Sequence, residues 1–221
     1  MKKNLSDLWR EHKMLLIITS CVILLQTVVG VALWDQLPEQ IATHFDFHNN
    51  PDGWSSKAFT VFGMPLILLA LHLICMLASG SPERMGKIYG KQLRYVMMFT
   101  TPAVSLLLMV VCYGHALGAA FNVGRVVLPF VGATLVIVGN YLPKIRRNPT
   151  MGIRVPWTLA DDENWHKTHR FAAPVWVVGG LLLIVLGLIG YTDYLAFCAI
   201  FAIILLPIIY SFAQHLKKIK R

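Results

Sequence analysis

MLLIITSCVILLQTVVGVALW, residues 14–34, is the stretch of sequence that sets the fold class. It contains no charged residue and lies between Lys13 and Asp35. An α-helix needs about 20 mainly apolar residues to cross the hydrocarbon core of a bilayer, and this run is long enough. No small-residue cleavage site of the kind that ends a signal peptide follows it before Asp35. The stretch therefore predicts a first transmembrane helix.

The composition of the whole chain extends this prediction. Its 221 residues are 56% hydrophobic and 14% charged, whereas a soluble domain carries about 25% charged residues. Six segments are apolar enough to span: roughly Met14–Trp34, Phe59–Ala78, Val96–Ala119, Val126–Leu142, Ala173–Ile189 and Leu195–Ala213. The predicted fold class is all-α: a polytopic membrane protein with six transmembrane helices.

The distribution of Lys and Arg predicts the orientation of these helices. The net charge is +9, and 18 of the 20 cations lie in the two terminal tails and in the second and fourth connections. Because Lys and Arg are enriched in cytoplasmic loops, both termini are expected in the cytoplasm. Orientation and contact with anionic lipid headgroups account for the positive charge, so no direct nucleic-acid binding is expected.

Two connections are long enough to carry function: residues 35–58, predicted to face outward, and residues 143–172, predicted to face inward. The first contains THFDFHNNPDGW, residues 43–54, in which His44, Asp46 and His48 alternate. In an extended chain these three side chains share one face, and two imidazoles with a carboxylate suit Zn²⁺. The alternative is a hydrated loop around a type I turn at residues 50–53, whose His and Asp side chains bond to the backbone. Ligand contact without a metal is a third possibility.

The inward connection contains NPTMGIRVPWTLADDENWHKTHRFAAP, residues 148–174. Thr158 is expected to cap a helix that carries its acidic residues in the first turn and ends near Phe171. Its aromatic residues predict an amphipathic helix lying along the cytoplasmic headgroups. Arg154, His169 and Arg170 are cations that can hold a carboxylate, a phosphate or the acidic side chains of the same loop.

Residues 140–170 resemble the signature of the SdpI family of bacterial multi-pass immunity proteins. The matching positions are Asn140, Tyr141, Pro143, Asn148, Gly152, Arg154, Pro156, Trp157, Thr158, Leu159, Trp165, His169 and Arg170. Residues 37–57 are similar to DUF1648, a domain of unknown function that often precedes the SdpI region. That match rests on Leu37, Pro38, Ile41, His44, Phe45, Pro51, Asp52, Gly53, Trp54, Ser56 and Lys57.

The chain also departs from these patterns. Ala42 stands where DUF1648 usually has Pro, and residues 46–49 replace a small turn containing Asn and Gly. The resemblance therefore includes His44 but not His48, which weakens the zinc hypothesis. Residues 171–173 read Phe-Ala-Ala where the SdpI pattern commonly has Gly.

The resemblance implies a DUF1648-like region over residues 1–95, with two transmembrane helices, and an SdpI-like region over residues 96–221, with four. It implies a multi-pass protein of the bacterial cytoplasmic membrane that protects the cell against a membrane-active peptide toxin. It also implies a signalling role, in which the toxin-bound protein captures a transcriptional repressor. Peptide toxin, a cytoplasmic repressor and membrane lipids are thus the expected partners.

The candidate site residues fall into two sets. Expected to face toxin or ligand in the outward loop are His44, Phe45, Asp46, His48, Asp52, Trp54 and Lys57. Expected to form the cytoplasmic motif are Asn140, Tyr141, Asn148, Gly152, Arg154, Trp157, Thr158, Glu163, Trp165, His169 and Arg170. No cofactor is expected, apart from zinc at His44, Asp46 and His48 as the alternative.

Two other functions remain open. A transporter of small molecules or lipids would use polar residues within the spans: Gln26, His72, His115 and Asn140. A metal-dependent membrane enzyme would use the His44, Asp46 and His48 loop, although no nucleophile motif accompanies it. The chain is not expected to be an enzyme.

Overall fold

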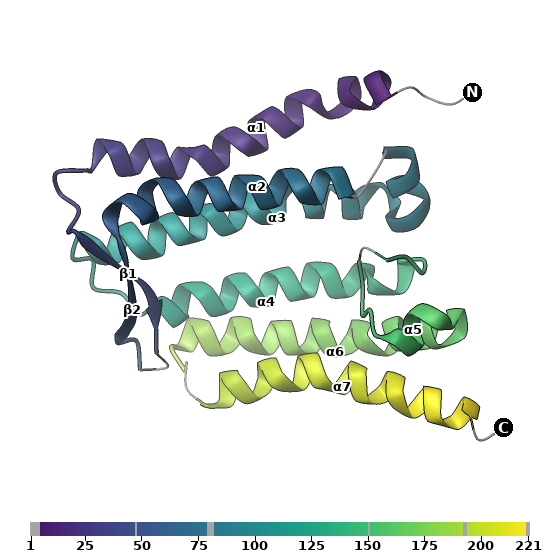
Figure 1. Cartoon of the computed structure of the whole chain (residues 1–221). Coiled ribbons are helices and arrows are strands. Elements are labelled where there is room, and N and C mark those ends of the chain that lie inside the picture. The colour runs from purple at the N-terminus through teal and green to yellow at the C-terminus, as the bar shows by residue number, and fades with distance from the viewer. Residues whose placement is uncertain (1–4, 47, 79–81, 150, 192–193, 220–221) are drawn as a thin grey trace. The chain divides into compact units, whose positions relative to one another are not determined.

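The computed structural model describes residues 5–46, 48–78, 82–149, 151–191 and 194–219. This part of the chain consists of helices, their connections and one two-stranded sheet (Figure 1). Contacts divide the chain into a first unit, Met1–Arg84 with Tyr95–Val123, and a second unit, Met85–Arg94 with Gly124–Arg221. Each long loop therefore lies within one unit. The contacts group residues 96–123 with the first unit, whereas the sequence resemblance divides the chain after residue 95.

Six helices in the described ranges are long and apolar enough to cross a membrane. They are α1 (Leu5–Ala32), α2 (Met64–Ala78) with the π-helical turn before it (Phe59–Gly63), α3 (Pro82–Ala116), α4 (Val123–Tyr141), α6 (Asp162–Ile189) and α7 (Tyr194–Ile219). Large apolar side chains such as Leu66, Ile74 and Val178 are exposed on these helices. Such exposure is expected where the surrounding solvent is lipid. The predicted fold class is confirmed.

The first unit has an interior that is partly polar. Leu37, Ile41 and Val61 form an apolar cluster with buried residues of α3. Elsewhere in this unit, His72 Nε2 lies 3.0 Å from Thr19 Oγ1, which joins α2 to α1. Ser105 on α3 donates to the Gln26 side chain on α1 at 3.2 Å. Hydrogen bonds of this kind help to hold membrane helices together.

A β-hairpin fills most of the first long loop. Strands β1 (Gln40–Phe45) and β2 (Pro51–Ser56) pair antiparallel, with irregular register around His44. The predicted type I turn at residues 50–53 is wrong, because Pro51 begins β2 and Gly53 pairs with His44. The chain reverses just before Pro51, where Asn49 has a positive φ of 66°. Asn adopts this left-handed conformation more readily than most residues.

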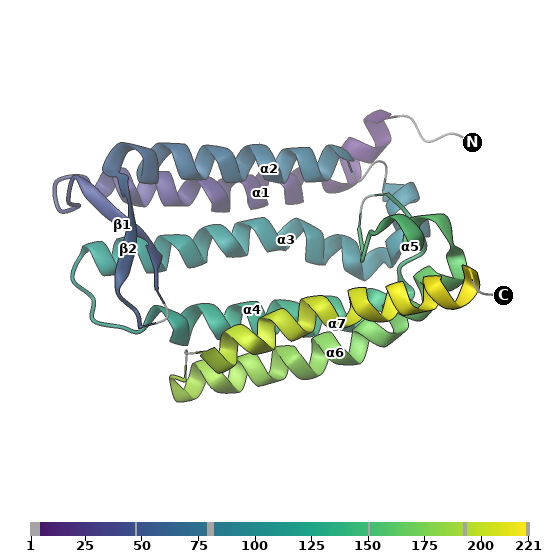
Figure 2. The same ribbon diagram turned by 60° about the horizontal axis from the view of Figure 1, so that its bottom comes forward.

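The second unit is built around close helix contacts. α6 and α7 lie side by side in both views (Figures 1 and 2). Leu128 of α4, Leu183 and Leu186 of α6, and Ala196 and Ile203 of α7 form its apolar core. Gly132 and Gly180 let α4 and α6 approach closely, because a Cβ on either glycine would collide with the backbone of the other helix. Small residues commonly allow such contacts between membrane helices.

The second long loop differs from the predicted amphipathic helix. It contains the 3₁₀ turn Leu142–Lys144 and a short helix, α5 (Pro156–Ala160), after which α6 begins directly at Asp162. The predicted end near Phe171 is wrong, because α6 continues through Pro174 into the fifth span. Thr158 is not the cap either: the Asp161 carboxylate accepts from the backbone N–H of Glu163, at 3.0 Å. The helix expected in the loop and the fifth spanning helix are therefore one continuous helix, α6.

Candidate functional site

The described residues of the hairpin include an exposed pair of polar side chains and an exposed aromatic residue. His44 Nδ1 lies 2.5 Å from Asp52 Oδ1, and their side chains are 74% and 47% exposed. Trp54 on β2 is 57% exposed. These three residues form a surface with one ionisable pair and one large apolar ring, which we call the hairpin face.

Lys57 was expected to face a ligand but is buried. Its ammonium donates to the carbonyl oxygens of Leu37 at 3.1 Å and Trp34 at 3.3 Å, and it pairs with Glu39 at 2.8 Å. It also lies 4.9 Å from the centre of the Trp34 ring. The structure therefore places Lys57 where it ties the hairpin to the end of α1.

The Asp46 carboxylate accepts hydrogen bonds from the backbone of the hairpin turn. Its Oδ1 accepts from the N–H groups of Asn50 at 2.8 Å and His48 at 2.9 Å, and its Oδ2 accepts from the Asn50 side chain at 3.2 Å. These donors, the Asn50 backbone N–H first, hold the pKa of Asp46 below its usual range. His44, meanwhile, is paired with Asp52. Among the described residues, no group of three His, Cys, Asp or Glu side chains is arranged so that it could hold a metal ion.

Two contacts anchor the far end of the hairpin within the first unit. Phe45 meets the His115 ring edge-on, with centroids 4.9 Å apart. Asn49 Oδ1 accepts from the backbone N–H of Val123 at 2.6 Å, and its Nδ2 donates to the Phe121 carbonyl at 3.3 Å. Sequence reasoning missed Asn49. The Asn-Asn pair before Pro51 was the available signal, because Asn tolerates a positive φ.

The motif of the second unit that is predicted to be cytoplasmic centres on two buried rings, those of Trp165 and His169. Trp165 is fully buried, and its Nε1 donates to the Ile145 carbonyl at 2.8 Å. His169 stacks on it, with centroids 4.1 Å apart. His169 Nδ1 lies 2.8 Å from the Trp165 carbonyl, so it must be the donor, and Nε2 accepts from the Ile153 N–H at 3.0 Å. This arrangement requires neutral His169, because a protonated imidazole has no acceptor.

Gly152 fits this pair of rings because it has no side chain. Its φ of 112° lies in a region that residues with a Cβ rarely adopt. A Cβ there would collide with His169 Nε2 and contact the Trp165 ring. Asn148 holds the preceding turn, since it donates to the carbonyls of Arg146 and Met151 and accepts from the Met151 N–H. Gly152 and Asn148 together allow the loop to pack against α6.

The short helix α5 is attached to α7. Trp157 Nε1 donates to Ser211 Oγ at 2.9 Å, and its ring lies near Phe212 and His215. The Thr158 hydroxyl accepts from the Val155 N–H at 3.1 Å, which stabilises the start of α5. Asn164, which sequence reasoning missed, donates to the Ser211 carbonyl at 3.0 Å. Its position three residues after a helix cap was no signal for a contact with α7.

Most of the remaining motif residues are exposed. Arg154 donates to the Pro149 carbonyl at 2.6 Å, and Glu163 pairs with Lys167 at 2.7 Å. Arg170 and Asn140 lie on helix surfaces, and Tyr141 is half-buried beneath the Lys144 ammonium. The motif thus consists of a scaffold, made by the buried residues Asn148, Thr158, Trp165 and His169 with the half-buried Gly152, and an exposed set of polar residues.

Comparison with known proteins identifies related sequences for both loops. Residues 144–211 match the SdpI/YfhL protein family, and residues 21–69 match the domain of unknown function DUF1648. The chain is also 28% identical over 200 residues to the immunity protein SdpI of Bacillus subtilis (strain 168), covering 90% of this chain and 93% of that protein. No solved structure matches the chain. The resemblance predicted from the sequence is confirmed.

Proposed function

We propose that this chain, a multi-pass membrane protein of the SdpI type with a DUF1648 region, protects its cell against a membrane-active peptide toxin. The observation that carries the proposal is the similarity to an immunity protein over 90% of this chain. A match of that extent reaches far beyond one motif. Similarity over most of both chains therefore supports a shared kind of activity.

The hairpin face is the proposed contact for the toxin. With both termini in the cytoplasm, residues 35–58 face outward, where a secreted peptide arrives first. Trp54 offers an exposed ring, and tryptophan is enriched among residues that dominate binding energy. The His44–Asp52 pair beside it provides a hydrogen-bonding group for the peptide backbone or for a polar side chain.

The cytoplasmic motif is the proposed site for signalling. Its buried scaffold holds the loop in one conformation, while Arg154 and Arg170 remain exposed. Exposed cations of this kind suit an acidic protein surface, because complementary charge guides association and specificity. Capture of a transcriptional repressor at this surface is the finer part of the proposal.

The test is survival of a toxin-sensitive bacterium that expresses this chain and is exposed to the peptide. Wild-type chain is expected to restore growth, and Trp54→Ala is expected to reduce that protection while membrane insertion is unchanged. Tyr191→Ala is the matched control, because Tyr191 is another exposed aromatic residue in a connection predicted to face outward. Growth equal to that of the empty vector with the wild-type chain would refute the proposal.

A transporter is the second candidate, and one observation favours it. In the first unit, Gln26 Nε2 and His72 Nδ1 are buried and have no hydrogen-bond partner among the residues that the structure describes. Buried polar groups inside a membrane commonly mark a path for a solute or ion. If transport underlies protection, changing His72 or His115 will abolish survival, whereas changing Arg154 and His169 will not.

A further inference from the structure

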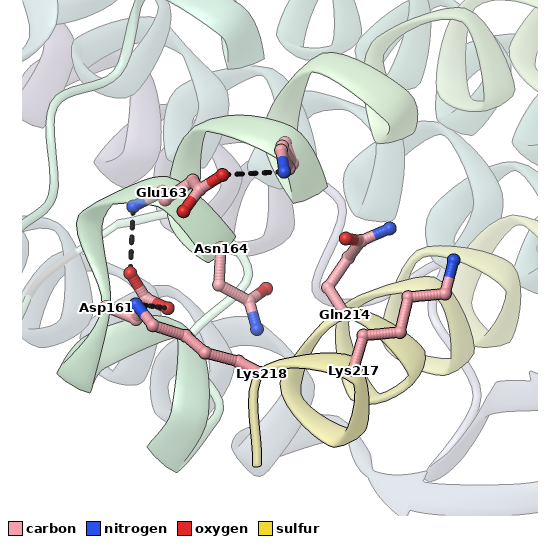
Figure 3. A pocket seen from close by; sticks show the side chains of 7 residues that line it. Asp161, Glu163, Asn164, Gln214, Lys217 and Lys218 are labelled. Atoms are coloured by element: carbon pink, nitrogen blue, oxygen red, sulfur yellow. Dashed lines mark hydrogen bonds and ion pairs between the residues drawn. The ribbon is translucent and has the colours of Figure 1, made fainter. Parts of the chain in front are cut away.

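A pocket of about 490 Å³ lies where α6 begins and α7 ends, within the second unit (Figure 3). Its lining residues are Asp161, Glu163, Asn164 and Lys167 from the start of α6, and Gln214, Lys217 and Lys218 from the last turns of α7. Both helices are long and apolar enough to cross a membrane. If the two helices span the membrane, this end of the pair lies at the level of the lipid headgroups.

The pocket is lined by three lysines and two carboxylates, so one positive charge is left over after the ion pairs are formed. Lys218 pairs with Asp161 at 2.8 Å, and Lys167 pairs with Glu163 at 2.7 Å. Lys217 forms no ion pair with any residue that the structure describes. The hydrogen bond from Lys218 holds the pKa of Asp161 below its usual range. The two ion pairs use both carboxylates of the pocket and leave Lys217 as the uncompensated charge.

The same face of α6 continues from the pocket as an exposed apolar stripe. Beyond Lys167, it includes Val178, Leu181, Val185 and Leu188, which are 51–67% exposed. The spacings of three and four residues keep these side chains on one side of the helix. In a spanning helix, such a stripe is suited to contact with acyl chains, and Lys167 at its end can reach the headgroup layer.

From the pocket and the stripe together, we infer that this chain binds an anionic phospholipid. The lipid phosphate enters the pocket between Lys167 and Lys217, and an acyl chain lies along the α6 stripe. An exposed ion pair contributes little free energy, so Lys167 can exchange Glu163 for a phosphate at small cost. Basic pockets between membrane helices on the cytoplasmic side are known to bind lipid headgroups. The net charge of the pocket favours an anionic over a zwitterionic lipid.

Native mass spectrometry of the purified full chain tests this inference. The protein is loaded with phosphatidylglycerol or with phosphatidylcholine, and the bound fraction is measured at increasing lipid concentration. We expect one phosphatidylglycerol per chain, retained more tightly than phosphatidylcholine. Changing both Lys167 and Lys217 to Gln should weaken it by roughly fivefold for each lysine. Arg146→Gln is the matched control, because Arg146 is an exposed cation of the same unit outside the pocket.

Glu163→Gln is the second variant, and it separates binding from misfolding. This change removes the carboxylate that pairs with Lys167, so phosphatidylglycerol should be retained more tightly than by the wild-type chain. Unfolding cannot produce such a gain. Equal retention by the wild type, the double lysine variant and Glu163→Gln would overturn the inference. So would equal affinity for phosphatidylcholine, displacement of the lipid by inorganic phosphate, or a dimer that excludes lipid from the stripe.

Discussion

At the scale of single residues, the motif residues divide by burial rather than by residue type. His169 and Arg154 both look like candidate ligand-binding cations in the sequence. The structure uses His169 as a neutral, buried link between α6 and the Ile153 backbone, whereas Arg154 is exposed. Gly152 belongs with His169, because the ring occupies the space that a side chain at 152 would need. The scaffold and the exposed surface should therefore respond differently to mutation.

Replacing Gly152 by Ala should destabilise the second unit strongly. The positive φ alone costs about 1–3 kcal/mol, and the collision with His169 and Trp165 adds to that cost. Thermal unfolding in detergent, followed by tryptophan fluorescence, should show a lower midpoint. Gly118→Ala is the matched control, since Gly118 has a φ of 83° but open space around it. Equal loss in the two variants would mean that the collision contributes nothing.

The Asp46 turn should depend on pH in a defined direction. The pKa of Asp46 lies below its ordinary value of 3.8 in the folded chain, so the folded state binds this proton less readily. Its contribution to stability is therefore complete well above pH 3.8 and is lost as the pH falls through the folded-state pKa. Asp46→Asn should remove that pH dependence. Amide hydrogen exchange at His48 and Asn50, followed as a function of pH in the wild type and in Asp46→Asn, tests this. Equal protection of the two amides at neutral pH in the wild type and in Asp46→Asn would contradict the prediction.

At the scale of elements, hydropathy predicts the spanning helices well, whereas turn-forming residues predict the hairpin poorly. The six spans were predictable because crossing a bilayer requires a run of apolar residues, which any window of sequence displays. The hairpin was not, because the partner of β1 is β2, a strand that contains Pro51 and Gly53 and has no alternating apolar pattern. The continuation of α6 through Pro174 was also missed. In a membrane helix, neighbouring groups can compensate for the hydrogen bond that proline removes.

Trp157 and Arg154 should both be required for function, for different reasons. Trp157→Ala removes the contacts of α5 with Ser211, Phe212 and His215, so the loop loses its attachment to α7. Arg154→Ala removes an exposed cation and leaves that attachment intact. Both variants should insert into the membrane normally and fail to protect in the survival assay. Trp157→Phe, which keeps the ring but not the hydrogen bond, should be intermediate, and full protection by both alanine variants would exclude this role.

At the scale of the whole molecule, the sequence predicted how many times the chain crosses the membrane but not how its contacts are grouped. The charges of each connection can be counted in the sequence, so the sequence predicts an orientation for the helices. The grouping of residues 96–123 with the first unit depends on contacts such as Tyr113 with Gln26, which are 87 positions apart in the chain. The sequence around Tyr113 and the sequence around Gln26 give no sign of this contact. For the same reason the candidate site was predicted as a set of residues and not as a scaffold with an exposed surface.

The orientation itself is open to a direct test. Alkaline phosphatase is active only outside the cytoplasm, so a fusion after residue 50 should be active and a fusion after residue 150 inactive. The reverse result would place the hairpin face in the cytoplasm and remove it from any secreted peptide.

The contact between Gly152 and His169 also has an evolutionary consequence. A lineage that gains a side chain at position 152 must first make room at position 169, and a smaller residue there leaves the Ile153 N–H without its acceptor. Each single step is therefore harmful on its own. The two positions should change together or not at all, and related sequences can be searched for that paired inheritance.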